Sequence, residues 1–430
     1  MGAMDARHVP LPGRHPTPRA AVSPSAEESL DQRFARTWTA LGEIGRDRTT
    51  GGYRRSAWTP ADLELRDWFA AQAAQRGMAC ERDRNGNQWA WWGTPAAGAV
   101  VTGSHLDSVP DGGAYDGPLG VVSGFLAVDE LRARGVEPQR PIAVVAFSDE
   151  EGARFGMACT GSRLLTGALD PDRARGLRDR DGVTLAEAMR RAGADPAGLG
   201  RDDETLARIG TFVELHAEQG RALVHTGHPV GVATAIWPHG RWRYRFEGEA
   251  DHAGTTRLVD RRDPVLPFAS TVLAARALAR RAGGVATFGR VEVSPNGTNA
   301  IPSRVEAWLD SRAPDDATVA ELVAGITAAA ERAAGPHGTT VRVTRESWSP
   351  AVDFDERLRD RIGSVLGGVP ALPTAAGHDA GILAARVPTA MLFVRNPTGI
   401  SHSPAEHVPA DDCTAGVRAL AAVLEDLACR

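Results

Sequence analysis

Three short apolar runs in the first half of the chain are each followed closely by residues that can bind a metal ion. The runs are residues 100–102, 142–147 and 212–215. The residues that follow them are His105, Glu150 with Glu151, and His216. Segments with a helical pattern alternate with these runs up to about residue 220, which is typical of a sheet covered by helices. Because ligands gather beyond the carboxyl ends of the strands in such sheets, we expect these side chains to converge.

The pattern changes near residue 240, which predicts a second domain of a different kind. Trp242, Tyr244 and Phe246 alternate with arginines, as in a strand with one buried face. The elements expected after it are a helix over residues 264–282, strands near 286–293 and 305–309, a helix over 315–335 and a strand at 340–344. This βαββαβ order is typical of a ferredoxin-like α+β domain.

Candidate site residues resume after this second domain, at His378 and His402, so we predict that it is inserted into the first. The expected division is a flexible leader of residues 1–25, an α/β domain of residues 26–228 and 346–430, and an inserted domain of residues 229–345. A chain of 430 residues exceeds what one hydrophobic core usually fills, which also favours two domains.

Composition and charge exclude several classes of protein. The net charge of -5 and the sequence pI of about 6.2 indicate no basic surface for nucleic acid. No apolar stretch approaches the roughly 20 residues of a membrane-spanning helix, and the proline-rich leader lacks the apolar run of a signal peptide. The four cysteines show no CxxC spacing, so we expect free thiols and a cytoplasmic location. Lysine is absent, which excludes Schiff-base chemistry, and no nucleophile elbow or nucleotide-binding motif is found.

A set of imidazoles and carboxylates matches what a hydrolase with two metal ions requires. Such a site needs a carboxylate that bridges both ions, terminal ligands for each ion, and a base for the proton of water. The candidate ligands are His105, Asp116, Glu151, His216 and His402. Asp116 is the candidate bridge, because a short carboxylate in a turn that contains Gly112, Gly113 and Gly117 can reach two ions about 3.5 to 4 Å apart.

Three further residues are candidates for catalysis. Glu150 and Glu151 are adjacent and point in opposite directions in an extended segment, so Glu151 can bind metal while Glu150 acts as a base. Asp107 can accept the second ring N–H of His105 and thereby fix its tautomer. His252 lies in the predicted inserted domain, where a donor imidazole suits stabilisation of an oxyanion once the domains close.

Six motifs give the chain a specific resemblance to a known family. They are HLDSVPDGGAYDG, SDEEGARFG, VELHAEQG, EADHAGTT, NGTNAIPSR and GISHSPAEH. In this order, and from roughly Thr37 to the C-terminus, the chain resembles the dinuclear-metal amidohydrolases that cleave carbamoyl and ureido groups. These are the N-carbamoyl-L-amino acid hydrolases, β-ureidopropionases and allantoate amidohydrolases of the M20-like aminoacylase and carboxypeptidase clan. His216 stands where exopeptidases of the clan typically have a carboxylate, which favours the carbamoyl-hydrolase branch.

The resemblance implies a fold, a set of cofactors and an assembly. The implied fold is an α/β, mixed-sheet metallohydrolase domain with an inserted ferredoxin-like α+β domain that serves as a dimerisation or lid domain. The implied cofactors are two divalent metal ions per subunit, Zn or Mn with Co or Ni as replacements, held by the five ligands with Asp116 as the bridge. Glu150 would be the general base and acid. The implied assembly is a homodimer, with His252 reaching the active site of the neighbouring subunit and Arg312 close to the interface.

By the same resemblance, Gln219, Asn299 and Arg312 bind the α-carboxylate of a small-molecule substrate. A planar guanidinium recognises a carboxylate bidentately, which agrees with this role for Arg312. We also assign Gly377 and His378 to substrate binding, although TAAGHDAG departs from the more usual Ser-Gly-Ala before Gly377. The expected reaction is hydrolysis of a linear ureido or carbamoyl C–N bond, in allantoate or in an N-carbamoyl-L-amino acid.

Two other functions stay open at the level of sequence. An N-acyl-amino acid hydrolase or peptidase of the same clan would use the same ligands. A metal-stabilised dimeric binding scaffold would need the ligands but not Glu150. Single residues also have structural alternatives: Asp107 could cap a turn, Arg312 could form a surface ion pair, and His407 could replace His402 as a ligand.

Overall fold

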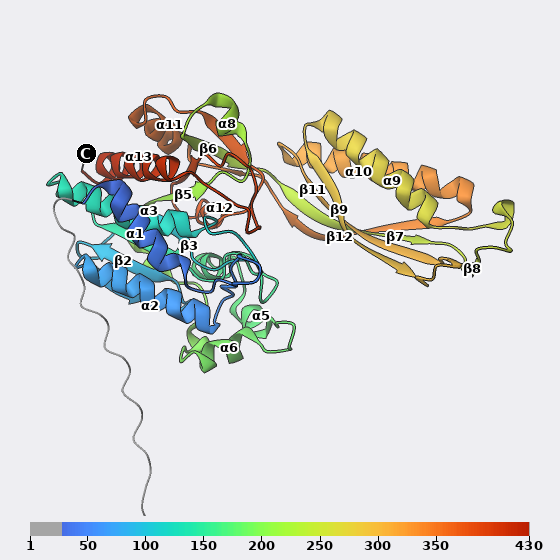
Figure 1. Ribbon diagram of the computed structural model, residues 1–430, viewed down its shortest axis with the longest axis horizontal. Coiled ribbons are helices and arrows are strands. Elements are labelled where there is room, and N and C mark those ends of the chain that lie inside the picture. The colour runs from blue at the N-terminus through green and yellow to red at the C-terminus, as the bar shows by residue number, and fades with distance from the viewer. Residues whose placement is uncertain (1–27, 430) are drawn as a thin grey trace, which may run out of the picture.

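The computed structural model describes residues 28–429 and shows two bodies of unequal size (Figure 1). The expected leader, residues 1–25, lies outside the described residues. The larger body is built on a nine-stranded sheet and the smaller one on a four-stranded sheet. A two-stranded pair, β8 (Asp251–His252) with β10 (Ala300–Ile301), lies at the far end of the smaller body.

The nine-stranded sheet is mixed, with a parallel centre. Its strands, in spatial order, are β1 (Ala79–Arg82), β2 (Gln88–Trp92), β4 (Ile142–Phe147), β3 (Ala99–His105), β5 (Ile209–Ala217), β15 (Thr389–Val394), β6 (Val230–Ile236) and β13 (Val352–Asp353), and β14 (Ala371–Thr374) also pairs with β6. β4, β3, β5 and β15 run parallel to one another. These four strands are almost entirely buried, as expected for parallel strands covered on both faces. The predicted α/β fold with a mixed sheet is confirmed.

Helices cover both faces of this sheet. One face carries α1 (Leu30–Gly42), α2 (Pro60–Gln75), α3 (Pro118–Ala133), α11 (Glu356–Val365) and α13 (Ala410–Cys429). The other face carries α4 (Thr160–Thr166) and α12 (Asp379–Leu383). Alternate residues of one strand enter different cores, Val100 the first and Val101 the second, as the pleat requires. The connections contain α5 (Pro171–Gly176), α6 (Leu185–Arg191), α7 (Asp203–Arg208) and α8 (Ala222–Thr226). None of the helices within residues 28–429 combines the length and apolarity needed to cross a membrane.

The four-stranded sheet is antiparallel, and two helices cover one of its faces (Figure 1). Its elements, in chain order, are β7 (His239–Glu247), α9 (Val265–Ala282), β9 (Val285–Ser294), β11 (Arg304–Arg312), α10 (Asp316–Ala334) and β12 (Thr340–Ser349). The spatial order β12–β7–β11–β9 places the fourth strand beside the first and the third beside the second, as in a ferredoxin-like fold. Trp242, Tyr244 and Phe246 face the helices and form the core, so the arginines between them face outward.

The four-stranded sheet begins and ends later than the expected boundaries at residues 229 and 345. β6 follows residue 229 but pairs with β15 of the larger sheet, and β12 continues to Ser349. Both differences have the same physical reason. The apolar pattern of a strand shows that it is buried, but its pairing partner, which is distant in sequence, decides the sheet to which it belongs.

Candidate metal centre and substrate cleft

The candidate metal ligands lie where the parallel strands of the larger sheet end. His105 is the last residue of β3, His216 is the last but one of β5, and Glu150 and Glu151 follow β4 in a turn. The register places His105 opposite Phe147, the last residue of β4. Parallel pairing therefore carries the three strand ends to one edge of the sheet, which explains why the side chains meet there.

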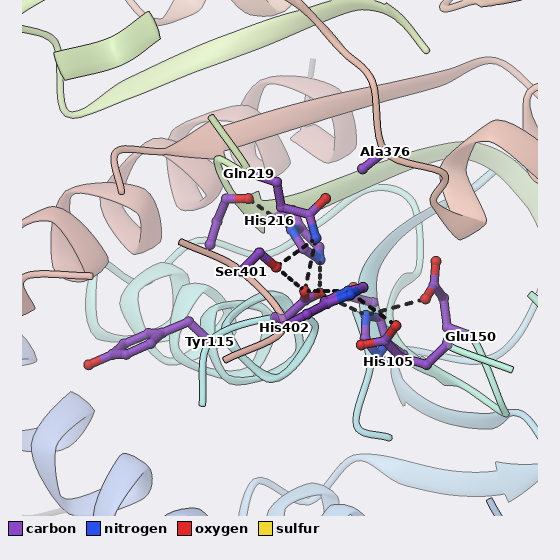
Figure 2. A network of polar contacts seen from close by, with 12 residues as sticks. His105, Tyr115, Glu150, His216, Gln219, Ala376, Ser401 and His402 are labelled. Carbon is purple, nitrogen blue, oxygen red and sulfur yellow. Dashed lines mark hydrogen bonds and ion pairs between the residues drawn. The ribbon is translucent and has the colours of Figure 1, made fainter. Parts of the chain in front are cut away.

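The carboxylate of Asp116 lies at the centre of the site. Figure 2 shows His105, His216 and His402 converging on one point from different segments. Oδ1 of Asp116 lies 3.1 Å from Nε2 of His216 and 3.6 Å from Nε2 of His105. Oδ2 lies 3.3 Å from Nε2 of His402. The two oxygens of one carboxylate thus face different histidines, which is the arrangement that a bridging ligand requires.

Backbone carbonyls orient two of these histidines. Nδ1 of His105 donates to the carbonyl of Asp107 at 3.1 Å, and Nδ1 of His216 donates to the carbonyl of Ala217 at 2.9 Å. Because a carbonyl only accepts, the proton sits on Nδ1 and each Nε2 keeps its lone pair. Both Nε2 atoms are buried and find no hydrogen-bond partner among residues 28–429. A fixed tautomer with a buried lone pair is what a metal-binding imidazole needs, so these residues fit a metal ion.

Two groups of potential ligands share Asp116. One group is His105, Asp116 and His216, and the other is Asp116, Glu151 and His402. In each group the ligand atoms lie within 4.8 Å of one another. Oε2 of Glu151 is 3.3 Å from Nε2 of His402. The geometry therefore offers two adjacent positions for cations, joined by one carboxylate.

Polar side chains and a glycine hold Asp116 in place. Its Oδ2 accepts hydrogen bonds from Nε2 of Gln219 at 2.8 Å and from Oγ of Ser401 at 2.6 Å. The buried carboxylate of Glu406 accepts the backbone N–H of Asp116 at 3.1 Å. Gly117 adopts φ 86°, and a Cβ there would lie 2.4 Å from Cε1 of His105. Only glycine can pass this close to the imidazole, which gives a structural reason for the glycine-rich turn.

Glu150 lies beside the ligand groups but belongs to neither. Its Oε2 is 3.8 Å from Nε2 of His105, and its Oε1 accepts a hydrogen bond from Sγ of Cys159 at 3.5 Å. The carboxylate of Asp107 accepts the backbone N–H groups of Glu150 and Glu151, each at 3.1 Å. That carboxylate lies 3.6 Å from Nδ1 of His105. The ring N–H therefore goes to the carbonyl of Asp107 rather than to its carboxylate, which instead shapes the turn of the two glutamates.

Burial and the histidines act differently on the three carboxylates. Burial raises the pKa of Glu150 well above its ordinary value and raises the pKa of Glu151 to about 7. Burial acts on Asp116 in the same direction, but the three neighbouring histidines outweigh it and hold the pKa of Asp116 well below its ordinary value. Asp116 is therefore suited to remain an ionised ligand, whereas Glu150 has the raised proton affinity that a general base and acid needs.

Three residues in or beside the candidate site have a strained backbone conformation. Asp149, Cys159 and His402 have φ values of 56°, 55° and 55°, in the left-handed region that residues other than glycine rarely adopt. Each of these residues precedes or carries a group of the site. Such strain persists only where the surrounding contacts over-determine the conformation, and it is enriched at functional sites.

A cleft of about 270 Å³ opens beside the ligands, between the larger sheet and the end of the four-stranded sheet. The residues assigned to substrate binding from sequence that line it are Gln219, Arg312, Gly377 and His378. Nε of Arg312 donates to Asp310 at 2.9 Å, and its Nη1 donates to the carbonyl of Ala375. The cleft thus joins Glu150 and the ligands to a guanidinium from the other body.

His378 is buried in the wall of the cleft. It is 3% exposed, and its ring centroid lies 4.5 Å from that of His216. Burial lowers the pKa of His378 well below its ordinary value. Glu214 approaches the same two histidines, but its oxygens accept hydrogen bonds from Ser104 at 2.7 Å and from the N–H of Ala380 at 2.9 Å. His378 is therefore a neutral imidazole at the floor of the cleft.

His252 and Asn299 lie together, away from this cleft. His252 pairs with Ala300 across β8 and β10, and the carbonyl of Asn299 accepts the N–H of Ala253 at 3.0 Å. β8 lies at the end of the smaller body that points away from the larger one (Figure 1). The sequence analysis assigned Asn299, Gln219 and Arg312 together to binding of the substrate carboxylate. Within one chain, however, Asn299 lies apart from the other two residues.

The imidazole of His252 has a defined tautomer. Its Nδ1 accepts the backbone N–H groups of Gly254 at 3.0 Å and Thr255 at 3.2 Å. The proton of the neutral ring must therefore sit on Nε2. His252 thus presents an N–H donor at the exposed end of the smaller body.

The sequence model of peptidase family M20/M25/M40 matches residues 101–426 of the chain, a range that contains all five candidate metal ligands. The chain belongs to this family. The resemblance predicted from the six motifs is confirmed.

Relatives within the M20 family include named amidohydrolases. The chain is 39% identical over 394 residues to the N-carbamoyl-L-amino acid amidohydrolase of Geobacillus stearothermophilus, which covers 88% of this chain and 94% of that protein. It is 33% identical over 428 residues to the allantoate amidohydrolase of Escherichia coli strain K12, with 92% and 98% covered. A crystal structure of an amidase of the hydantoinase/carbamoylase family from Burkholderia multivorans matches with a TM-score of 0.85 and 31% identity, covering 93% of this chain and 98% of that one.

Several residues of the site were not singled out from sequence. They are Cys159, Arg163, His239, Ser401 and Glu406. Ser401 and Glu406 stand within the GISHSPAEH motif, so their position beside His402 was a usable signal. Cys159, Arg163 and His239 carry no such signal, because their place in the cleft depends on how distant segments pack.

Proposed function

We propose that this protein is a metal-dependent amidohydrolase that cleaves a linear ureido or carbamoyl C–N bond of a carboxylate-bearing small molecule. Allantoate and N-carbamoyl-L-amino acids are the two candidate substrates. One observation carries the proposal: Asp116 joins two groups of potential metal ligands, and the cleft beside them contains both a carboxylate outside these groups, Glu150, and a guanidinium, Arg312. The named activities of the relatives support the same reaction class.

Two divalent cations fit the donor set. His105 and His216 would hold one ion and Glu151 and His402 the other, with Asp116 shared. Mixed imidazole and carboxylate ligands suit Zn or Mn, with Co or Ni as replacements. When bound, such ions supply Lewis acidity and lower the pKa of a water molecule.

The protein groups have separate tasks in this reaction. Glu150 takes a proton from the attacking water at one carboxylate oxygen and returns it to the leaving nitrogen. Cys159 donates to Oε1 of Glu150 at 3.5 Å, which leaves Oε2 directed to the side of His105. Arg312 binds the substrate carboxylate through its planar fork and so sets the distance between that group and the scissile bond.

We also propose a homodimer in which the smaller body carries the interface. Its surface exposes large apolar side chains, among them Leu258 at 81%, Val259 at 84% and Leu273 at 72%. β9 is an edge strand of the four-stranded sheet, so its outer backbone groups are available for a second copy. In such a dimer the exposed His252 and Asn299 would complete the cleft of the neighbouring subunit, where Nε2–H of His252 can stabilise an oxyanion.

A reducing compartment agrees with the cysteines. Cys80, Cys159 and Cys413 are free thiols in the structure. We therefore propose a cytoplasmic location, as the sequence predicted.

A substrate panel tests the proposed function. Purified protein, loaded separately with Zn²⁺ or Mn²⁺, is assayed for ammonia release from allantoate and from several N-carbamoyl-L-amino acids, and for amino acid release from N-acetyl-L-amino acids. Turnover of a ureido substrate supports the proposal. Turnover of N-acetyl substrates alone would assign the chain to acyl-amino acid hydrolysis instead, and metal binding without any turnover would favour a binding scaffold.

A further inference from the structure

One arginine of the cleft has a charge that no described carboxylate neutralises. Arg163 belongs to α4 and lines the cleft together with Glu150 and Arg312. Its Nε donates to the carbonyl of Ala158 at 3.0 Å, which fixes the plane of the guanidinium. Within residues 28–429, Arg163 has no ion-pair partner, and its two Nη groups have no hydrogen-bond acceptor.

The other two arginines of the cleft, unlike Arg163, are paired with a carboxylate. Arg312 and Arg241 lie on neighbouring strands of the four-stranded sheet. Asp310 pairs with both of them, at 2.9 Å from Nε of Arg312 and 3.5 Å from Nε of Arg241. Arg163 comes from the larger body, on the side of the general base. A substrate in the cleft therefore meets guanidinium groups from both bodies, and of these three arginines only the one on α4 lacks a carboxylate partner among residues 28–429.

The position of Arg163 places this charge close to the reacting centre. It follows Cys159 by one turn of helix, and Sγ of Cys159 donates to Glu150. Burial raises the pKa of the Cys159 thiol well above its ordinary value, and the nearby charge of Arg163 opposes that shift. The guanidinium is thus within electrostatic reach of the group that contacts Glu150.

Part of the wall is apolar. Ile236, Val352 and Ile382 line the same cleft and offer no hydrogen bonds from their side chains. Arg163 is half-buried, so its unpaired guanidinium is only partly hydrated and can accept an oxygen of the ligand as a partner. Its two free Nη groups form a fork that matches a planar group with oxygen acceptors, namely a carboxylate or a ureido carbonyl.

We propose that Arg163 binds a second oxygen-acceptor group of the substrate, so that the enzyme prefers ureido compounds whose side chain carries a carboxylate or carbonyl over those whose side chain is apolar. This inference rests on the proposed function. Arg312 takes the α-carboxylate, and Arg163 selects the substituent on the α-carbon. Both allantoate, which has a second ureido group, and N-carbamoyl derivatives of acidic amino acids satisfy this requirement.

Three substrates of nearly equal shape test the proposal. They are N-carbamoyl-L-aspartate, N-carbamoyl-L-asparagine and N-carbamoyl-L-leucine, and allantoate is assayed beside them. We expect the kcat/KM of the wild type for the aspartate compound to exceed that for the leucine compound by about 10- to 100-fold, the range that a charge-assisted hydrogen-bonding pair provides. Equal rates for aspartate and asparagine compounds would identify carbonyl recognition, and a preference for aspartate would identify charge recognition. Both results support the second acceptor.

Variants connect the preference to one side chain. Arg163→Met keeps most of the volume and removes the charge, and Arg163→Lys keeps the charge without the fork. We expect Arg163→Met to remove the preference for aspartate and to lower kcat/KM for allantoate, with the leucine compound unaffected. Arg163→Lys should retain part of the preference. Arg191→Met, at an exposed position of α6 outside the cleft, is the matched control and should leave all ratios unchanged.

The outcome that overturns the inference is specific. If the wild type hydrolyses the leucine compound as fast as the other substrates, or if Arg163→Met lowers every kcat/KM by one common factor, Arg163 does not select the substituent. Because the ratios are measured within one preparation, partial unfolding of a variant cannot mimic the expected result. If the wild type hydrolyses no ureido substrate at all, the proposed function itself fails, which is a distinguishable result.

Discussion

Replacing Glu150 by Gln separates proton transfer from metal binding. Glutamine keeps the shape of the side chain and an oxygen that can accept the hydrogen bond from Cys159, which lies at 3.5 Å from Oε1 in the wild type. It removes the capacity to take a proton from water. The other two carboxylates of the cleft, Asp116 and Glu151, are not positioned to act as the base in its place. Each faces a histidine of the candidate metal centre: Asp116 lies 3.1 Å from Nε2 of His216, and Glu151 lies 3.3 Å from Nε2 of His402.

The magnitude follows from the lack of a substitute base. A general base contributes about 10²- to 10⁴-fold to kcat, which corresponds to about 3 to 5 kcal/mol of activation free energy. With both other carboxylates directed to histidines, we expect Glu150→Gln to lower kcat by about 10⁴-fold, the upper end of that range. KM should change little, because Arg312, the residue proposed to bind the substrate carboxylate, is untouched. Stability should be retained or increased, because a buried negative charge is removed.

The assay compares two adjacent substitutions. Glu150→Gln and Glu151→Gln are purified in parallel, and metal content is measured by elemental analysis together with kcat for the best substrate. We expect wild-type metal content in Glu150→Gln, whereas Glu151→Gln should lose about one ion per chain because it removes a ligand. If Glu150→Gln loses metal, or if it retains more than about a tenth of the wild-type kcat, the assignment of Glu150 as the base is refuted.

Three further predictions address the cofactors, the assembly and the pH dependence of stability. Chelation should reduce activity to below about 1% and lower the melting temperature, and Zn²⁺ or Mn²⁺ should restore both, since ligands oriented for metal bind it only in the folded chain; unchanged activity after verified metal removal would contradict the proposed site. Mixing inactive His252→Ala with inactive Glu150→Gln and allowing subunits to exchange should restore about a quarter of wild-type activity, because half of the dimers are mixed and each has one complete site; no recovery in dimers shown to be mixed would exclude a shared site. Burial raises the pKa of Asp83 to about 6, so this carboxyl stabilises the fold below about pH 4 and loses that contribution as the pH rises through its folded pKa. As the pH rises from 4 to 7, the free energy of unfolding of Asp83→Asn should therefore increase relative to that of the wild type by up to about 3 kcal/mol, measured by urea denaturation. A difference between the two proteins that stays constant across that pH range would contradict the raised pKa.

The candidate metal ligands could be picked out from the sequence because their signals are local. His105 and His216 follow apolar runs, and Asp116 stands in a glycine-rich turn. In the structure, Gly117 of that turn passes so close to the imidazole of His105 that no Cβ would fit. Parallel strands carry their carboxyl ends to one edge, so a sequence that marks strand ends also marks the site. The alternation of Trp242 with its neighbours marked a half-buried strand in the same way.

The walls of the cleft were not predictable, because register and packing decide them. Strand pairing places His239, Arg312 and Ser349 in one row at the end of the four-stranded sheet, and all three line the cleft. No sequence pattern states which strands pair, so this row emerges only in three dimensions. The sequence does not single out Arg163 for a related reason: it is one of many arginines, and what distinguishes it is that it has no ion-pair partner within residues 28–429.

Asp107 shows why metal binding and proton transfer are linked in this fold. Its carboxylate accepts the N–H groups of both Glu150 and Glu151, and its carbonyl accepts Nδ1–H of His105. The residue before the two glutamates, Asp149, has a φ of 56°, so the turn leaves regular geometry where these hydrogen bonds begin. Asp107 thus fixes the tautomer of His105 and the backbone from which Glu151, the candidate ligand, and Glu150, the candidate base, diverge. The sequence H-x-D and the two adjacent acids that follow it therefore form a single structural unit. A backbone shift that moved Glu150 would also move Glu151, so the position of Glu150 alone can be changed only through its own side chain.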